Sequence, residues 1–275
     1  MNKAFLQRTA AFITAILSGV MLFCCCGGDT DVNDDEFPEL VIGVDYYVPF
    51  VFCDDNGEFA GMDVELAKEV CRHIGYKPKF YHIDWGKKNT YLLRGETDCL
   101  WGCFSLTGRE NEYSWSLPYM NSREVVGVRE DSDIFEISDL ENKRIAVQAT
   151  TKPDEIFSGR AGIRMTVPNI KQVNCFHDMT YIFAAISKGY VDAIAGHETA
   201  IREYMKSSSL KLRILDESLL DVQVGVAFLK GTNSDIIEKI NRTFLLLRDN
   251  GYISKLFASY GLAPEICMVN YEQNK

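Results

Sequence analysis

The sequence lacks the features that mark several common classes of protein. It holds 29 basic and 39 acidic residues, for a net charge of -10, and contains no long basic run. A nucleic-acid-binding domain normally carries a basic patch, so the charge pattern excludes a nucleic-acid partner. Nine cysteines are too few for a disulfide-dense scaffold of 275 residues, and their spacings match no zinc site. The sequence therefore predicts neither a metal nor a cofactor.

The rest of the composition is that of an ordinary globular protein. Hydrophobic residues make up 47% and charged residues 25% of the chain, which excludes long disordered, collagen-like and coiled-coil segments. The length allows one large or two medium domains with a sizeable core.

The N-terminus is predicted to be a targeting segment. Residues 10–23 are almost wholly apolar, follow Lys3 and Arg8, and precede the first acidic residue, Asp29. The run has the length of a signal-peptide core and falls short of the roughly 20 residues that span a bilayer. It therefore directs export.

Three consecutive cysteines, Cys24 to Cys26, follow this apolar run directly. The sequence around Leu22 resembles the lipobox of a bacterial lipoprotein, with Cys25 as the expected lipidated residue and Cys26 as the second choice, although Phe23 is atypical of that motif. An ordinary cleaved signal or an uncleaved anchor is the alternative. We assign residues 1–25 to the signal peptide and lipobox, and residues 26–38 to an acidic flexible tether.

From residue 40 onward, strand and helix patterns alternate, which predicts an α/β fold with mainly parallel sheets. The expected strands lie at 40–44, 79–83, 99–101, 144–148, 193–195 and 222–228. The expected helices lie at 62–74, 89–94, 179–188, 198–206 and 235–250, the last with Ser234 as its N-cap.

Residues 93–102 and 187–196 share one pattern: a helix end, Gly, two residues, Asp, a short apolar strand and Gly. This repeat predicts two similar α/β lobes, unless it is a chance similarity of short α/β units. No linker-like composition separates the lobes, so crossing strands are expected to join them, with hinges near residues 125–128 and 225–228. A ligand cleft would then lie between the lobes, at the carboxyl ends of the strands.

Residues that follow the predicted strands could hold a ligand there. Aromatic residues around Tyr47 and at Trp85 could form a stacking surface, although single aromatic residues are often core filler. The loop after the third strand ends in Arg109, whose guanidinium suits a carboxylate, unless it pairs with Glu110. The second lobe offers a helix start after Thr151 and the pair His197 and Glu198.

Between about residues 39 and 262 the chain resembles the family 3 extracellular solute-binding proteins, the polar amino-acid-binding components of ABC importers. The resemblance rests on the order and spacing of seven stretches, at 44–50, 61–67, 105–107, 116–119, 145–148, 189–193 and 249–251. It implies a periplasmic-binding-protein-like fold, in which two α/β lobes are joined by two crossing hinge strands around a ligand cleft. We expect residues 39–126 plus 226–264 to form lobe 1, residues 127–225 lobe 2, and residues 265–275 a C-terminal tail.

The resemblance also assigns site residues by position. Tyr47 and Trp85 are similar to the ligand-stacking residues, and Phe52 to a wall of the site. Arg109 is similar to the carboxylate-binding arginine. The remaining positions implied in the cleft are Gly102, Cys103, Ser105, Thr107, Thr150 and Thr151.

The sequence departs from the family pattern at three places. The loop between Thr107 and Arg109 is a residue short, and Ala149 replaces a usual glycine. The family's ammonium-binding Asp falls on His197. Either Glu198 supplies that charge, or the ligand lacks an ordinary α-amino group.

The expected function is capture of a small carboxylate-bearing ligand, an amino acid in the first instance, without catalysis. The expected partners are an ABC permease with its ATPase, and the membrane through a lipid anchor. The chain is expected to be a monomer, exported and held on the outer face of the membrane or in the periplasm. A carboxylate dehydratase with His197 and Glu198 as acid and base, and a ligand sensor without transport, are the alternatives.

Overall fold

The computed structural model describes residues 37–160 and 167–271. The predicted signal peptide, the lipidation site at Cys25 and most of the acidic tether lie outside the described residues. Within the described residues, no helix combines the length and the apolar character needed to cross a membrane.

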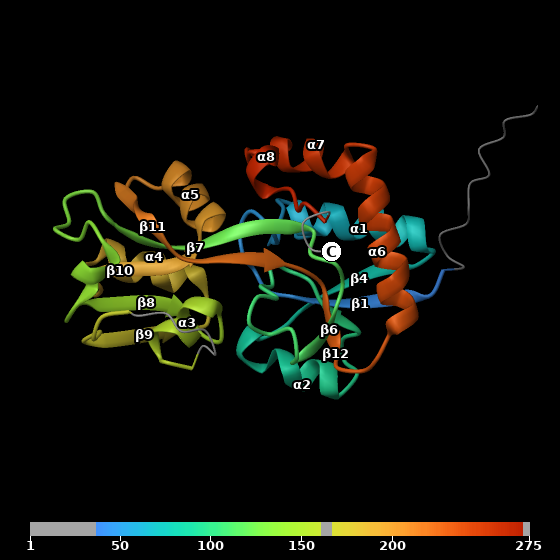
Figure 1. Cartoon of the computed structure of the whole chain (residues 1–275), viewed down its shortest axis with the longest axis horizontal. Coiled ribbons are helices and arrows are strands. Elements are labelled where there is room, and N and C mark those ends of the chain that lie inside the picture. The colour runs from blue at the N-terminus through green and yellow to red at the C-terminus, as the bar shows by residue number, and fades with distance from the viewer. Residues whose placement is uncertain (1–36, 161–166, 272–275) are drawn as a thin grey trace, which may run out of the picture. The chain divides into compact units, whose positions relative to one another are not determined.

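Two five-stranded sheets form the framework of the described chain (Figure 1). The first sheet has the strand order β4 (Lys77–His82), β1 (Glu39–Val44), β5 (Cys99–Leu100), β12 (Ala227–Leu229) and β6 (Tyr113–Trp115). The helical segments of this part are α1 (Met62–Ile74), the 3-10 turn η2 (Trp85–Lys87), α2 (Lys88–Leu93), α6 (Ser234–Asp249), α7 (Tyr252–Ser259) and α8 (Pro264–Cys267). A small hairpin joins β2 (Phe52–Cys53) to β3 (Phe59–Ala60).

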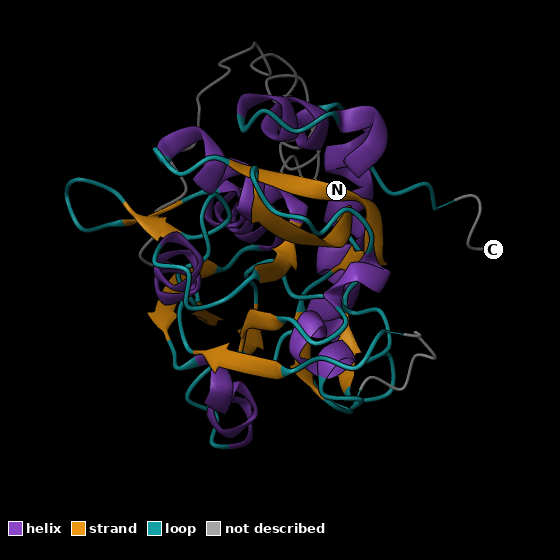
Figure 2. Cartoon of the chain, turned by 90° about the vertical axis from the view of Figure 1, so that its left-hand side faces the viewer, coloured by secondary structure: helices purple, strands orange, loops and turns teal. Residues whose placement is uncertain are grey.

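The second sheet has the strand order β11 (Leu212–Val224), β7 (Met120–Arg129), β10 (Ala193–His197), β8 (Arg144–Gln148) and β9 (Gln172–Phe176). Its helical segments are the 3-10 turn η3 (Ile137–Leu140), α3 (Lys152–Phe157), α4 (Met179–Ser187) and α5 (Glu198–Ser207). Seen from the side of this sheet, helices lie around the strands (Figure 2).

The sheets are mixed, and the expectation of mainly parallel sheets was wrong. β1 pairs in parallel with β4 and β5, and β8 pairs in parallel with β9 and β10. However, β12 is antiparallel to β5 and β6, and β7 is antiparallel to β10 and β11. The strands that run in the opposite sense, β7 and β12, are those that the chain forms directly after each passage between the sheets.

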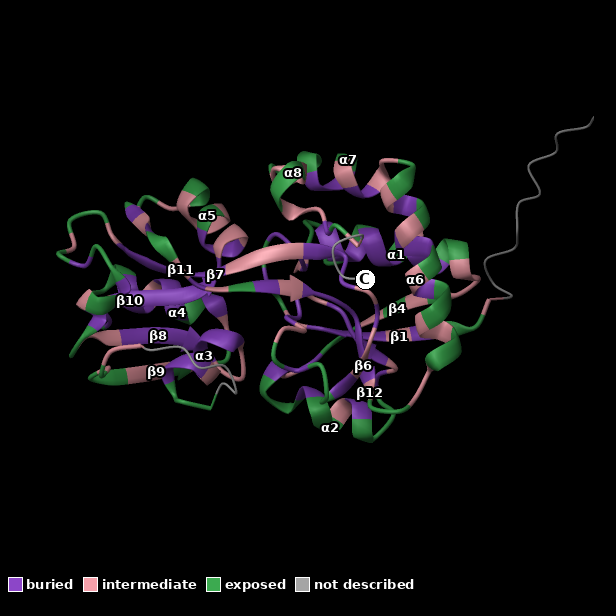
Figure 3. Cartoon of the chain, viewed as in Figure 1, coloured by how far each residue is buried: buried purple, intermediate pink, exposed green. Residues whose placement is uncertain are grey.

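The central strands are buried on both faces, which explains their continuous apolar runs (Figure 3). In β10, Ile194 packs into one apolar cluster, whereas Ala193 and Ala195 pack into another on the opposite face. In β5, Cys99 and Leu100 likewise pack into two different apolar clusters. Alternation of side chains along a strand produces this division.

The repeated pattern at 93–102 and 187–196 has the same structure in both copies. Gly95 and Gly189, with φ of 65° and 69°, each end a helix in the left-handed conformation that favours glycine. Asp98 then accepts a hydrogen bond from the Val41 amide at 2.7 Å, as Asp192 does from the Arg144 amide at 2.8 Å. Each Asp thus ties its own strand to the neighbouring parallel strand.

The chain crosses between the sheets at residues 116–119 and again at 224–226. These crossing segments lie side by side, because the Ser116 amide bonds the Val226 carbonyl and the Tyr119 amide bonds the Val224 carbonyl, both at 2.9 Å. The predicted hinge at 125–128 is wrong, since these residues pair with β10 inside the second sheet. The second sheet therefore begins at Met120 and not at 127, and the expected strand 222–228 is broken at Gly225 into β11 and β12.

The start of α1 fixes the turn that follows β1. The amides of Met62 and Asp63 donate to the carbonyls of Pro49 and Phe50, both at 3.0 Å. Gly61 makes this approach possible, because its φ is 119° and a Cβ there would lie 2.4 Å from the Phe50 carbonyl oxygen. Tyr47, on this turn, is thereby held at the edge of the first sheet.

Candidate ligand-binding site

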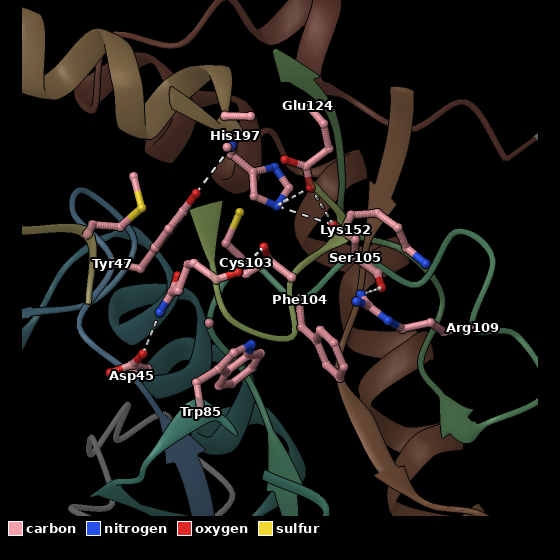
Figure 4. A pocket seen from close by; sticks show the side chains of 16 residues that line it. Asp45, Tyr47, Trp85, Cys103, Phe104, Ser105, Arg109, Glu124, Lys152 and His197 are labelled. Carbon is pink, nitrogen blue, oxygen red and sulfur yellow. Dashed lines mark hydrogen bonds and ion pairs between the residues drawn. The ribbon is translucent and has the colours of Figure 1, made fainter. Parts of the chain in front are cut away.

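A cavity lies where the ends of strands from both sheets face each other (Figure 4). Most of its residues lie at or just beyond the carboxyl ends of β1, β4 and β5 on one side and of β8, β9 and β10 on the other, and Glu124 of β7 adds to the second side. The lining residues are Asp45, Tyr47, Trp85, Gly102, Cys103, Phe104, Ser105, Arg109, Glu124, Gln148, Thr151, Lys152, Met179, Ala195, Gly196 and His197.

The first sheet contributes a rigid aromatic wall. Trp85 meets Phe104 edge to face, with ring centroids 5.0 Å apart. Cys103 has a φ of 51°, and its amide donates a 2.6 Å hydrogen bond to the buried carboxylate of Asp63. That bond holds the loop after β5 in a conformation that few residues other than glycine adopt.

Arg109 is buried and bonded on every side. Its Nε and Nη2 donate to Glu155 Oε1 at 3.0 and 2.5 Å, and its Nη1 donates to the Ser105 carbonyl at 3.0 Å. Glu155 also accepts a 2.6 Å bond from Lys152, whose side chain is 1% exposed. Arg109 thus already holds a carboxylate, that of a residue on α3 across the cavity.

A second cluster of polar side chains lies on the side of β7 and β10 and surrounds the ring of His197. Its Nε2 lies 3.2 Å from both Glu124 Oε1 and Ser105 Oγ, and its Nδ1 lies 2.9 Å from Ser122 Oγ. The amide of His197 donates to the Tyr47 hydroxyl at 3.1 Å. Burial, with the nearby Glu124 carboxylate adding to it, raises the pKa of Tyr47 well above its usual value.

Two further hydrogen bonds join the sheets across the cavity. Gln148 Nε2 donates to Asp45 Oδ2, and Lys88 Nζ donates to Thr150 Oγ1, both at 2.8 Å. Burial raises the pKa of Asp45 to about 6 and, with the charge of Arg109, lowers that of Lys88 to about 8. The structure is therefore closed, with polar side chains of one sheet bonded directly to the other.

The closed cavity retains a volume of about 30 Å³, which is room for a few water molecules at most. No group of three or more His, Cys, Asp or Glu residues within 37–160 and 167–271 has the arrangement to hold a metal ion. The polar lining instead offers charge-assisted hydrogen bonds to a small organic molecule.

The sequence model of the bacterial extracellular solute-binding proteins, family 3, matches residues 40–263. The chain belongs to this family. Its members are extracellular proteins that bind solutes. The L-cystine-binding protein TcyA of Bacillus subtilis (strain 168) is 26% identical over 221 residues, which cover 79% of each chain.

Solved structures of binding proteins share the fold of this solute-binding protein. The P235GK mutant of ArgBP from T. maritima has a TM-score of 0.72 and 29% identity, and the match covers 81% of this chain and 94% of that one. The ancestral amino acid-binding protein AncCDT-1, described as a precursor of cyclohexadienyl dehydratase, has a TM-score of 0.71 at 23% identity over 81% and 95% of the chains. The predicted fold of two α/β lobes is confirmed.

The structure of this solute-binding protein brings eight of the twelve predicted site residues to the cavity: Tyr47, Trp85, Gly102, Cys103, Ser105, Arg109, Thr151 and His197. Their roles toward a ligand stay predictions.

The other four predicted residues do not line the cavity. Phe52 lies in the β2–β3 hairpin. The Thr107 hydroxyl accepts from the Gln223 amide at 2.9 Å, and Thr150 faces Lys88. Glu198 bonds Arg123 at 2.8 Å and Arg202 at 2.6 Å, and these arginines hold its pKa below the usual value.

Sequence reasoning missed several polar residues of the site. Glu124 and Lys152 line the cavity, and Glu155 bonds Arg109 from beside it. One signal for Glu124 was available, because it is an acidic residue directly before the apolar run 125–128 of a buried strand. The sequence held no such signal for Lys152 and Glu155, since charged residues at the start of a helix are usually exposed to solvent.

Proposed function

We propose that this solute-binding protein captures an α-amino acid and delivers it to an ABC import permease. The observation that supports this most directly is the pairing of two buried charged groups in one closed cavity. One is the guanidinium of Arg109 and the other is the carboxylate of Glu124, 3% and 1% exposed. A zwitterion needs one group of each sign.

Within this proposal, the ligand carboxylate replaces that of Glu155 on the guanidinium of Arg109, and Ser105 and Thr151 offer hydroxyls to it. Tyr47 and Trp85 form the walls against which the side chain of the ligand packs. The cavity of this structure is too small for an amino acid, so the lobes must separate for entry and then close around the ligand less tightly than they do here. The crossing segments 116–119 and 224–226 are where such hinge bending would occur.

Ligand contacts from both lobes exist together only in the closed state, so a ligand shifts the population toward closure. The permease and its ATPase would then recognise the closed form. The names of the relatives support the ligand class, because TcyA is named for L-cystine and a structure described as arginine-bound ArgBP also matches this chain. Lipidation at Cys25 would hold a monomer beside the permease on the outer face of the membrane.

Catalysis by the same cavity is the alternative that the structure itself suggests. His197 and Glu124 form a buried imidazole–carboxylate pair, an arrangement that also suits proton transfer. Turnover of prephenate-like acids by the purified protein would favour a dehydratase over a transport protein.

Isothermal titration calorimetry of the purified protein against the twenty standard L-amino acids and L-cystine tests the proposal. We expect saturable binding of at least one of them, with one ligand per chain. Absence of any binding, together with a different class of small molecule found by mass spectrometry in the purified protein, would refute the amino-acid assignment.

A further inference from the structure

Glu124 is the most deeply buried acidic side chain that lines the cavity. It lies near the middle of β7, and the residue is 1% exposed. Its Oε1 accepts from Ser105 Oγ at 3.3 Å and lies 3.2 Å from His197 Nε2. Its Oε2 is buried and has no hydrogen-bond partner among the residues that the structure describes.

The position of this carboxylate is fixed by strand pairing. Glu124 stands opposite His197 in the antiparallel ladder between β7 and β10, so both side chains leave the sheet on the same face. Figure 4 shows the two side chains meeting beside Ser105. Within the described chain, no lysine or arginine forms an ion pair with Glu124. A buried carboxylate with a free oxygen is costly unless a cationic donor reaches it.

Ser105 lies between this carboxylate and the guanidinium of Arg109. The Ser105 hydroxyl bonds Glu124 at 3.3 Å, and the carbonyl of the same residue accepts from Arg109 Nη1 at 3.0 Å. The negative and positive groups therefore flank a single residue. This spacing suits a ligand whose ammonium and carboxylate are close neighbours, as on one α-carbon, better than a long ω-amino acid.

We propose that Glu124 binds the ammonium of the ligand, and that the ligand class is α-amino acids with a free, cationic α-amino group. This inference rests on the proposed function. It replaces the two expectations from the sequence, namely that Glu198 supplies the charge or that the ligand lacks an ordinary α-amino group. Glu198 cannot supply the charge to the cavity, because its carboxylate is bonded to Arg123 and Arg202 outside it. The ligand is not required to lack an amino group.

A matched set of probes tests the assignment in wild type and in Glu124→Gln, which keeps the side-chain size and removes the charge. The probes are the twenty L-amino acids with L-cystine, their 2-oxo acids, which lack the ammonium, and the amines histamine, agmatine and cadaverine, which lack the carboxylate. Calorimetry gives each affinity. We expect Glu124→Gln to weaken the best amino acid about 10- to 100-fold and its 2-oxo acid by less than about threefold.

Two further variants serve as comparisons. Glu238→Gln makes the same change on the exposed surface of α6 and should leave every affinity unchanged, and thermal melting confirms that each variant is folded. Glu198→Gln tests whether the other acidic candidate, Glu198, is responsible for the selective binding of the amino acid over its 2-oxo acid. An equal loss for the amino acid and its 2-oxo acid in Glu124→Gln overturns the assignment, as does a larger selective loss in Glu198→Gln.

The outcomes separate this assignment from the proposed function. If amino acids bind and Glu124→Gln changes nothing, the function stands and the role of Glu124 is wrong. If only amines bind, with loss in Glu124→Gln, the role of Glu124 stands and the amino-acid function is wrong. Wild type that binds no ammonium-bearing probe contradicts the assignment.

Discussion

Replacing Arg109 by alanine is expected to weaken binding of the amino-acid ligand by about 100-fold. The guanidinium is rigid, buried and aimed at the cavity, and a bidentate bond to a carboxylate is among the strongest hydrogen-bonded interactions in proteins. Each bond to a charged group contributes about 1.5–3 kcal/mol, and about 1.4 kcal/mol is a tenfold change in affinity. Titration calorimetry of wild type and Arg109→Ala with the same amino acid measures the loss.

The bond between Arg109 and Glu155 offers a second reason for such a loss, because it also joins the two lobes. Glu155→Gln separates the two reasons. If Arg109 acts by holding the lobes together, Arg109→Ala and Glu155→Gln should weaken binding equally. If it binds the ligand carboxylate, Glu155→Gln should bind at least as tightly as wild type, since a competing carboxylate is gone. Arg94→Ala, on the exposed end of α2, is the matched control. An affinity of Arg109→Ala within about threefold of wild type contradicts the role.

The elements of the fold followed from local patterns. The apolar stripe and the closing glycine placed α1 at 62–74, where it is found, and the apolar runs placed β1 and β8 correctly. The apolar residues of these elements recur with a period that shows which of them are buried, and α1 also satisfies its own backbone hydrogen bonds. The α6 N-terminus was misplaced by one residue, since Asn233 in a left-handed conformation precedes the helix and Ser234 lies within it.

The crossing between the lobes could not be located in the same way. The apolar run 125–128 looks like any buried strand, and only pairing with β10 shows that it belongs wholly to the second sheet. The true crossing at 116–119 is defined by hydrogen bonds to residues more than 100 positions later in the chain. Such partners leave no periodic signal in the sequence.

The site residues also fall into those that local sequence patterns could predict and those that depend on partners distant in the sequence. Residues in the loops that follow predicted strands, such as Tyr47, Trp85 and Arg109, were found because strand ends meet at one edge of a sheet. Glu124 was missed because it lies within a strand, and its access to the cavity depends on its partner His197 in the neighbouring strand. Glu198 was chosen for its charge, but it bonds two arginines outside the cavity: Arg202, four residues later on the predicted helix, and Arg123 of β7, which the sequence could not place beside it.

Stability should fall between pH 5 and pH 8 because of Asp63, and Asp63→Asn should remove that part of the fall. Burial raises the pKa of Asp63 to about 7, while bonds from the Cys103 amide and the Tyr119 hydroxyl, at 2.6 and 2.8 Å, lower it in part. The folded state therefore keeps a proton that the unfolded state releases at lower pH. The stabilisation is fully present below the unfolded-state pKa and is lost as the pH rises through about 7.

Urea unfolding at pH 5 and pH 8 measures this effect as a difference between two proteins. We expect the free energy of unfolding of wild type to drop by about 2–3 kcal/mol more than that of Asp63→Asn, since each pH unit of unequal proton binding costs about 1.4 kcal/mol. Tyr119→Phe should steepen the fall, because it removes a hydrogen bond that favours the charged form. Asp55→Asn, in an exposed turn, should follow wild type. Parallel behaviour of wild type and Asp63→Asn would show that the carboxylate tying α1 to the Cys103 loop is ionised throughout, with its burial fully compensated by those two bonds.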